Sequence, residues 1–274
     1  MTASPKEISR RCANPRGSTE LPLSGNRGGG TNRNRHDRLS GRGIRPPAPG
    51  VKALPSDADP ANPLNSQDYR PIPGWSLLLF VVALLAIGFG ALRFVPLHEM
   101  LPVLGAFFAI ALVSVGVAVL PLGWGAIPAL GLRGANWKYV VFGALGTMVL
   151  SVAVSQSGLQ PEGMKQVFEI VQGPGQLGIS LLLLAVLAPL VEELVFRGLL
   201  YGWLAGRWGK TTGWIVSSLA FAAAHTEPAH IVLVFPLGLL FGWLRQRTDS
   251  LLPSLVAHIA NNGLALVAAA YLDS

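Results

Sequence analysis

Charged residues are scarce in this sequence, and their scarcity restricts what the chain can be. Asp, Glu, Lys and Arg make up 13% of its 274 residues, whereas hydrophobic residues make up 51%. This balance is unusual for a soluble domain and is typical of a protein whose surroundings are largely lipid. Cysteine is nearly absent as well: because Cys12 is the only one, the chain can form no internal disulfide.

The first 70 residues lack the hydrophobic runs of the rest and carry most of the net charge. They hold 12 of the 21 Lys and Arg residues and six of the 14 Asp and Glu residues. They are rich in Gly, Pro, Asn, Ser and Arg, and no apolar signal stretch follows the basic residues at their start. Such a segment cannot bury enough apolar surface to offset its chain entropy, so we predict a disordered, basic N-terminal tail over residues 1–70.

The basic tail also bears on the partners of the protein. No folded motif for reading nucleic acid accompanies it, and a basic segment next to a membrane domain is typical of a tail that faces the lipid surface. We therefore expect the lipid bilayer as a partner, and no nucleic acid. Residues 71–274 would form the transmembrane domain.

Apolar stretches of about 20 residues recur after the tail, which is the length that crosses roughly 30 Å of hydrocarbon as a helix. The sequence therefore predicts an all-α, polytopic transmembrane bundle of about seven helices. The fifth and sixth stretches are short and close together, so the number of full spans could be six to eight. The predicted helices are 75–94, 100–122, 137–155, 177–204, 213–225, 231–244 and 251–271.

Basic residues alternate between the loops in the way that the positive-inside rule describes. This alternation predicts a multi-pass integral membrane protein with a cytoplasmic N-terminus and an external C-terminus, in a bacterial-type plasma membrane. The loops on the tail side hold Arg133, Lys138, Arg207, Lys210, Arg245 and Arg247, and the opposite loops hold Glu162, Lys165, Glu169 and Glu227.

The fourth apolar stretch contains three charged residues where lipid-spanning helices tolerate few. Glu192, Glu193 and Arg197 each cost about 2.5–3.5 kcal/mol to insert at the centre of a membrane helix. Glu193 and Arg197 are spaced i,i+4 and can pair along one face of the helix. Glu192 then remains without a local partner. A structural ion pair would explain Glu193 and Arg197, but it would not require the second acid.

The fifth and seventh stretches add further polar residues to this set. Phe221 and His225 share one helix face, as do His258 and Asn262. A single histidine or asparagine in a membrane helix is often a packing residue or an interhelical contact. Glutamate, two histidines and an asparagine on three otherwise apolar helices nevertheless indicate a catalytic site.

These motifs resemble those of a known family of membrane proteases. The patterns Glu192-Glu193-x-x-x-Arg197, Phe221-x-x-x-His225 and His258-x-x-x-Asn262, in this order, are similar to the three motifs of the CAAX-protease and bacteriocin-processing family, the type II CAAX prenyl endopeptidases. Ala188-Pro189 before the glutamates also matches. The resemblance covers residues 177–262, and the first three helices match only in hydropathy.

The resemblance implies an intramembrane endopeptidase that hydrolyses a peptide bond. Glu192 with His225 would activate a water molecule, and His258 with Asn262 would stabilise the developing oxyanion. Glu193, Arg197 and Phe221 would support these groups. The substrate would be a peptide or a lipidated protein, in the family's pattern a prenylated CAAX-type C-terminus or a membrane-associated peptide.

Other interpretations of the same residues remain open. Glu192, His225 and His258 form a set that can bind zinc, although no His-Glu-x-x-His motif is present. The sequence favours metal-free glutamate catalysis without a cofactor, with a zinc metalloprotease as the alternative. A proton-coupled transporter is disfavoured because no repeated halves are evident. A non-catalytic membrane scaffold or immunity protein is disfavoured by the intact motifs.

Overall fold

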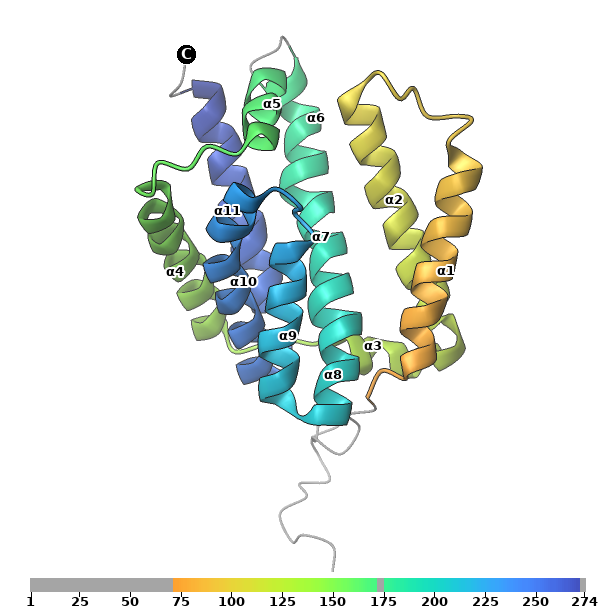
Figure 1. The fold of residues 1–274 in the computed structure, drawn as a ribbon. Coiled ribbons are helices and arrows are strands. Elements are labelled where there is room, and N and C mark those ends of the chain that lie inside the picture. The colour runs from red at the N-terminus through yellow and green to blue at the C-terminus, as the bar shows by residue number, and fades with distance from the viewer. Residues whose placement is uncertain (1–70, 172–174, 272–274) are drawn as a thin grey trace, which may run out of the picture. The chain divides into compact units, whose positions relative to one another are not determined.

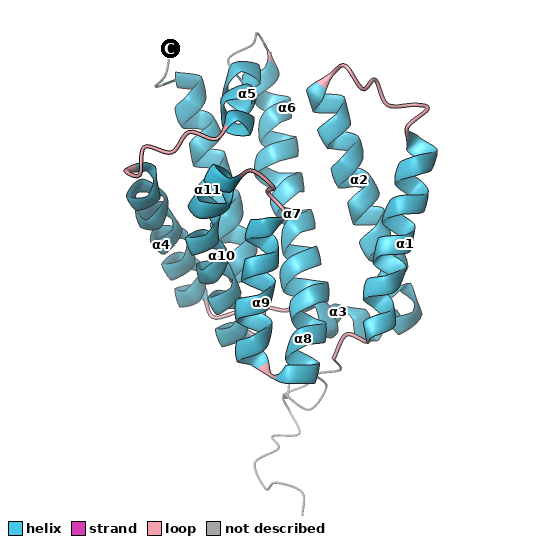
Figure 2. Cartoon of the chain, viewed as in Figure 1, coloured by secondary structure: helices cyan, strands magenta, loops and turns pink. Residues whose placement is uncertain are grey.

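A computed structural model of the chain describes residues 71–171 and 175–271. Over these residues the chain is a bundle of helices without a strand (Figures 1 and 2), as the hydropathy predicts. The predicted disordered tail lies outside the described residues.

The helices follow one another with short connections. Their bounds are α1 Gly74–Ala91, α2 Met100–Val119, α3 Ala126–Leu130, α4 Trp137–Ser155, α5 Glu162–Val171, α6 Gln176–Ser180, α7 Ala188–Glu192, α8 Tyr201–Trp208, α9 Lys210–Ala223, α10 Pro228–Thr248 and α11 Leu252–Tyr271, with a 3₁₀ segment η2 at Leu120–Gly125 and π-helical segments η3 at Leu181–Leu187 and η4 at Glu193–Leu200. The segments from α6 to α8 form one continuous helix, Gln176–Trp208.

Six helices in the described part of the chain are long and apolar enough to cross a membrane. The predicted fifth helix is the exception. Its counterpart α9 has 14 residues and is about 21 Å long, too short for a full span. The predicted sixth helix is longer than expected: α10 has 21 residues, because it begins three residues earlier, at Pro228, and continues through Arg245 to Thr248. The expectation that both segments are short was therefore wrong for the second.

A helix that the sequence analysis missed follows α4. The segment with Glu162, Lys165 and Glu169 was expected to be a loop, but it forms α5. Its charges lie at helical spacing between apolar residues, and Val171 is buried. The amphipathic pattern of residues 162–171 is a signal that could have predicted this helix.

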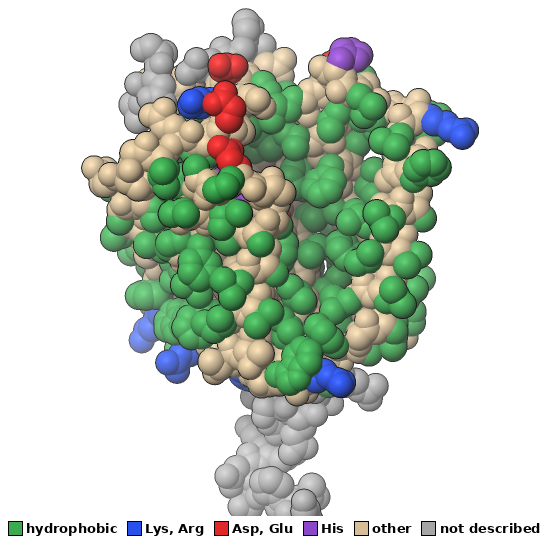
Figure 3. All heavy atoms as spheres, in the orientation of Figure 1, with side chains coloured by type: hydrophobic (Ala, Val, Ile, Leu, Met, Phe, Trp, Pro, Cys, Tyr) green, Lys and Arg blue, Asp and Glu red, His purple; other side chains and the backbone are tan. Residues whose placement is uncertain are grey.

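Charge separates the two ends of the bundle. The connections α3–α4, α8–α9 and α10–α11 lie at one end (Figure 1), and Figure 3 shows Lys and Arg side chains gathered there, with most acidic side chains at the other end. Between the ends, large apolar side chains face outward; Phe89 is 76% exposed and Leu182 is 60% exposed. Outward-facing apolar side chains between polar ends are what a lipid-embedded bundle requires.

Close packing of α9 against α10 depends on glycines in α10. A Cβ atom at Gly242 would lie 2.7 Å from the Ser218 hydroxyl oxygen and from the Trp214 ring, and one at Gly238 would lie 2.9 Å from the Phe221 ring. Small residues at such contacts allow membrane helices to approach closely. The half-length helix α9 is therefore held against α10 from Trp214 to Phe221, and Phe221 is buried near its C-terminal end.

Candidate active site

The helix that carries the two glutamates is widened on both sides of them. The π-helical segments η3 and η4 flank α7, which ends at Glu192. π-Helical turns are frequent at functional sites, because the extra residue frees backbone groups from the helix ladder. Here the widening has a definite consequence at the carbonyl group of Leu184.

The carbonyl of Leu184 lacks the α-helical donor four residues along the chain and the π-helical donor five residues along. The N–H of Ala188 bonds to the carbonyl of Leu183 instead, and Pro189 has no N–H. The side chain of Asn262 on α11 fills the gap, since its Nδ2 donates to the Leu184 oxygen over 3.0 Å. Asn262 therefore ties α11 to the helix of the glutamates, in a place where an unpaired carbonyl would be costly.

Glu193 and Arg197 form the predicted ion pair, and both side chains are fully buried. Arg197 Nη1 lies 3.1 Å from Glu193 Oε1, and Arg197 Nη2 donates to the carbonyl of Gly238 on α10. The guanidinium also lies over the ring of Phe221, 4.2 Å from its centroid. The backbone of Arg197 is held in turn, because Arg245 Nε donates to its carbonyl. This pair fixes the glutamate helix against α9 and α10.

His258 lies between the two glutamates. Its Nδ1 is 3.2 Å from Glu193 Oε1, and its Nε2 is 3.5 Å from Glu192 Oε2. The ring stacks on Phe241, with centroids 4.7 Å apart and planes 24° apart. Whereas Glu193 is fully buried, the Glu192 side chain is 22% exposed, so it is the member of the pair that solvent and substrate can reach.

His225 follows the last turn of α9 and is held by its own backbone. Its Nδ1 lies 3.0 Å from the carbonyl of Phe221, so Nδ1 carries the proton and Nε2 has the free lone pair. The Phe221 ring touches both imidazoles, with centroids 5.1 Å from His225 and 5.7 Å from His258. The ring of His230 also contacts that of His225, at 4.5 Å.

All four predicted catalytic side chains line one cavity of about 960 Å³. Glu192, His225, His258 and Asn262 contribute part of its polar surface, together with residues such as Ser151, His230 and Asn261, and apolar side chains of α2, α4, α5 and α10 contribute much of the rest. A cavity of this size can hold a peptide segment with an apolar substituent. The structure thus brings together residues from three helices that the sequence separates by up to 70 positions.

Two contacts add to the predicted roles. Glu192 was expected to act with His225 on a water molecule, and the imidazole at ion-pair distance from Glu192 is that of His258. Asn262 was expected to stabilise the oxyanion, and one of its N–H groups also donates to the carbonyl of Leu184. The stacking of His258 on Phe241 carried no signal in the sequence, because Phe241 stands within an apolar run of α10.

The three proposed zinc ligands do not fit a metal as they are placed. Among the described residues, no group of three or more His, Cys, Asp and Glu side chains is arranged to hold a metal ion. Both ring nitrogens of His258 face glutamates, and Nδ1 of His225 faces a carbonyl. The placement of these side chains therefore suits acid and base chemistry better than metal binding.

Fold and site together define a multi-pass integral membrane protein with an acid and imidazole site in a cavity between its helices. Comparison with known sequences is consistent with this class. The family described as type II CAAX prenyl endopeptidase Rce1-like matches residues 174–264, which include all three motifs. Over this region the chain is similar to the Rce1-like family, and the matched residues contain the three motifs.

Individual relatives agree with the family match. YdiL of Bacillus subtilis (strain 168), described as a candidate membrane peptidase, is 24% identical over 204 residues, which cover 70% of each chain. The membrane-embedded CAAX protease MroQ of Staphylococcus aureus (strain USA300) is 26% identical over 126 residues, 44% of this chain and 51% of MroQ. An uncharacterized 24.3 kDa protein of Escherichia coli is 32% identical over 94 residues, 32% of this chain and 43% of that one. No solved structure matches the chain.

Proposed function

We propose that this protein is an intramembrane endopeptidase in which Glu192 activates the water that attacks a peptide bond. The observation that carries the proposal is the array Glu192–His258–Glu193, with one glutamate open to the cavity and the other buried. Names of the relatives support a peptidase, and the geometry supports hydrolysis by acid and base chemistry.

The charge of the cluster supports this use of Glu192. Glu193 and Arg197 balance each other, so Glu192 and His258 can together hold one further proton without leaving net charge in the membrane. Because Nδ1 of His258 faces Glu193, the added proton is shared between His258 Nε2 and the Glu192 carboxyl. A group that accepts and returns one proton at a cavity wall is what general acid and base catalysis requires.

In the proposed reaction Glu192 first accepts a proton and later returns it. Glu192 takes a proton from water as the water oxygen attacks the scissile carbonyl carbon, with Nε2 of His225 oriented to hold the water. His258, when protonated on Nε2, donates to the oxyanion, and the second N–H of Asn262 adds to this. As the C–N bond breaks, Glu192 returns its proton to the leaving amine.

We further propose that the substrate is the C-terminal segment of a membrane-associated peptide or of a lipidated, CAAX-type protein. The apolar wall of the cavity, contributed by residues such as Phe108, Leu237 and Phe168, supports a substrate with an apolar group. The family description of prenyl endopeptidases supports a prenyl chain.

The test is peptide cleavage in liposomes by the wild type and by Glu192→Gln, with matched farnesylated and unmodified peptides. Glu169→Gln, which removes an exposed carboxylate of α5, is the control. We expect a loss of at least about 10²-fold in kcat for Glu192→Gln and no change for the control. Equal cleavage of a peptide by the wild type and by Glu192→Gln would refute the proposed peptidase activity of this site. Equal cleavage of the farnesylated and the unmodified peptide would refute only the prenyl preference.

We further propose a bacterial-type plasma membrane with a cytoplasmic N-terminus. The charge asymmetry of the bundle supports the orientation, and the bacterial origin of the relatives supports the type of membrane. A reporter enzyme that is active only outside the cytoplasm, fused after residue 274, should be active. An inactive fusion, with activity in the cytoplasmic counterpart, would reverse the orientation.

A further inference from the structure

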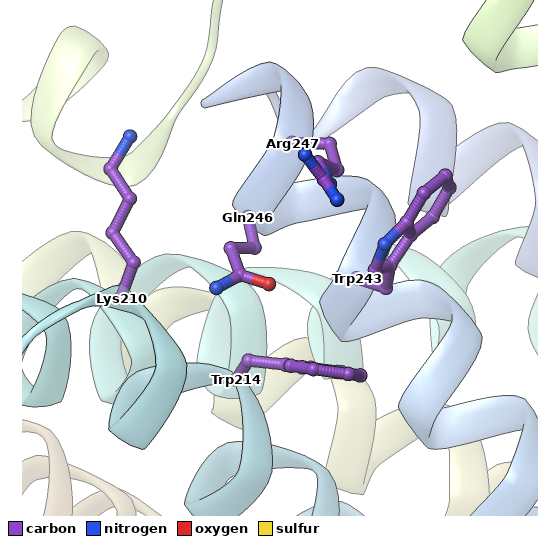
Figure 4. Close-up of a pocket in the computed structure, with 5 residues that line it drawn as sticks. All are labelled: Lys210, Trp214, Trp243, Gln246 and Arg247. Atoms are coloured by element: carbon purple, nitrogen blue, oxygen red, sulfur yellow. The ribbon is translucent and has the colours of Figure 1, made fainter. Parts of the chain in front are cut away.

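A second cavity lies at the basic end of the bundle, away from the proposed active site. It has a volume of about 540 Å³ and is lined by Lys210 and Trp214 of α9 and by Trp243, Gln246 and Arg247 of α10 (Figure 4). None of these residues lines the cavity of Glu192. The volume falls within the roughly 300–1,000 Å³ that is usual for sites of small ligands.

The two tryptophans give the cavity a fixed shape. Trp214 Nε1 donates to the carbonyl of Leu239 over 2.8 Å, and the close approach at Gly242 holds its ring against α10. The Trp214 ring extends across one side of the cavity and the Trp243 ring stands beside it (Figure 4). Both rings are half-buried and lie at the basic end of the bundle. Tryptophans at the ends of membrane helices commonly meet lipid headgroups.

Positive charge is in excess around these rings. Arg247 is exposed, its guanidinium lies 5.7 Å from the centroid of the Trp243 ring, and no carboxylate of the described residues pairs with it. Lys210 does have a partner, since its Nζ lies 2.6 Å from Asp249 Oδ2. Asp249 is the single acid in or beside the three connections at this end, against six Lys and Arg residues there: Arg133, Lys138, Arg207, Lys210, Arg245 and Arg247.

We propose that this cavity binds the phosphate-bearing headgroup of an anionic phospholipid from the leaflet that faces the basic end. Arg247 and Lys210 meet the phosphate, the Gln246 amide donates to headgroup oxygens, and the tryptophan faces border the glycerol and upper acyl chain. Basic cavities between membrane helices are suited to such headgroups. A lipid fits better than free phosphate, because α9 continues beyond the cavity with the exposed apolar residues Val216 and Leu219.

The test is native mass spectrometry of the full chain, released from detergent with phosphatidylglycerol or phosphatidylcholine of the same acyl chains. The double variant Lys210→Gln/Arg247→Gln removes the two charges of the cavity. Its control, Lys138→Gln/Arg207→Gln, removes two charges from the same end outside the cavity. We expect the wild type and the control to retain phosphatidylglycerol preferentially, and the cavity variant to lose about tenfold in its affinity.

Three results would overturn the proposal. Equal loss in both double variants would show general attraction to the basic end, and equal retention of both lipids by the wild type would show no headgroup selection. Displacement of phosphatidylglycerol by millimolar inorganic phosphate would assign the cavity to a soluble anion. Trp243→Leu, which leaves every charge in place, is the second variant: it should weaken retention several-fold, and unchanged retention would contradict the role of the rings.

Discussion

Asn262 has a structural role that can be tested separately from its proposed catalytic role: its side chain supplies the hydrogen bond that Pro189 cannot donate. Its amide bonds to the Leu184 carbonyl, which is free because Ala188 donates elsewhere and Pro189 lacks an N–H. Replacing Asn262 by Ala therefore leaves a carbonyl unpaired inside the bundle. Replacing Pro189 by Ala supplies a backbone N–H at position i+5 from Leu184, the spacing of a π-helical bond.

The size of the effect follows from the missing hydrogen bond. An unsatisfied buried carbonyl costs about 1–3 kcal/mol, and interhelical hydrogen bonds in membrane proteins average about 0.6 kcal/mol with a maximum of about 1.7. We expect Asn262→Ala to lower the free energy of unfolding by about 1–2 kcal/mol. In the Pro189→Ala background the cost should shrink by about 0.5–1.5 kcal/mol, because the new N–H can satisfy Leu184.

The assay is a double-mutant cycle of unfolding in bicelles, which removes the packing losses of each single variant. Additive effects of the two substitutions would refute the link between Pro189 and Asn262. Cleavage by the same four proteins separates the two roles of Asn262. If Pro189→Ala restores stability but not activity, then Asn262 also acts on the substrate, as proposed above.

Three further outcomes are expected. Arg197→Met should lower the free energy of unfolding by about 3–5 kcal/mol, because Glu193 is left buried without its cation; adding Glu193→Gln should recover part of this loss in thermal unfolding, and no recovery would contradict the pairing. Glu227→Gln should speed hydrogen exchange at the start of α5, because the Glu227 carboxylate accepts from the N–H groups of Glu162 and Gly163 over 2.8 and 3.4 Å; exchange like that of wild type would argue against the anchor. Cleavage should be insensitive to chelators, with no stoichiometric zinc by elemental analysis; activity restored by zinc would reverse the metal-free mechanism.

Hydropathy predicted the helices that are long enough to span a membrane, because every span must cover the hydrocarbon core with apolar side chains. The bounds of α4, Trp137–Ser155, are those predicted, and α11 differs by one residue at its start. Shorter elements followed other rules. The amphipathic α5 lies at a bundle end, where charges are tolerated, so its Glu and Lys residues looked like a loop.

Contacts within the site were harder to predict than its members. Spacing along one helix shows that Glu193 can reach Arg197, and the structure confirms that pair. Spacing does not show which histidine from another helix meets Glu192, because that depends on how α9 and α11 pack. Gly238 of α10 leaves room for the Phe221 ring to pack closely against α10, and this ring contacts both His225 and His258.

The structure offers a physical reason for two adjacent glutamates, because Glu192 and Glu193 make different contacts. Glu193 forms an ion pair with Arg197 and contacts Nδ1 of His258, so it fixes which ring nitrogen of His258 faces the cavity. Glu192 lies 3.5 Å from the other nitrogen and is open to the cavity. Under the proposed mechanism, removing Glu193 would free the His258 ring to turn, whereas removing Glu192 would leave the ring in place and take away the base. The proposal therefore assigns orientation of the imidazole to Glu193 and proton transfer to Glu192.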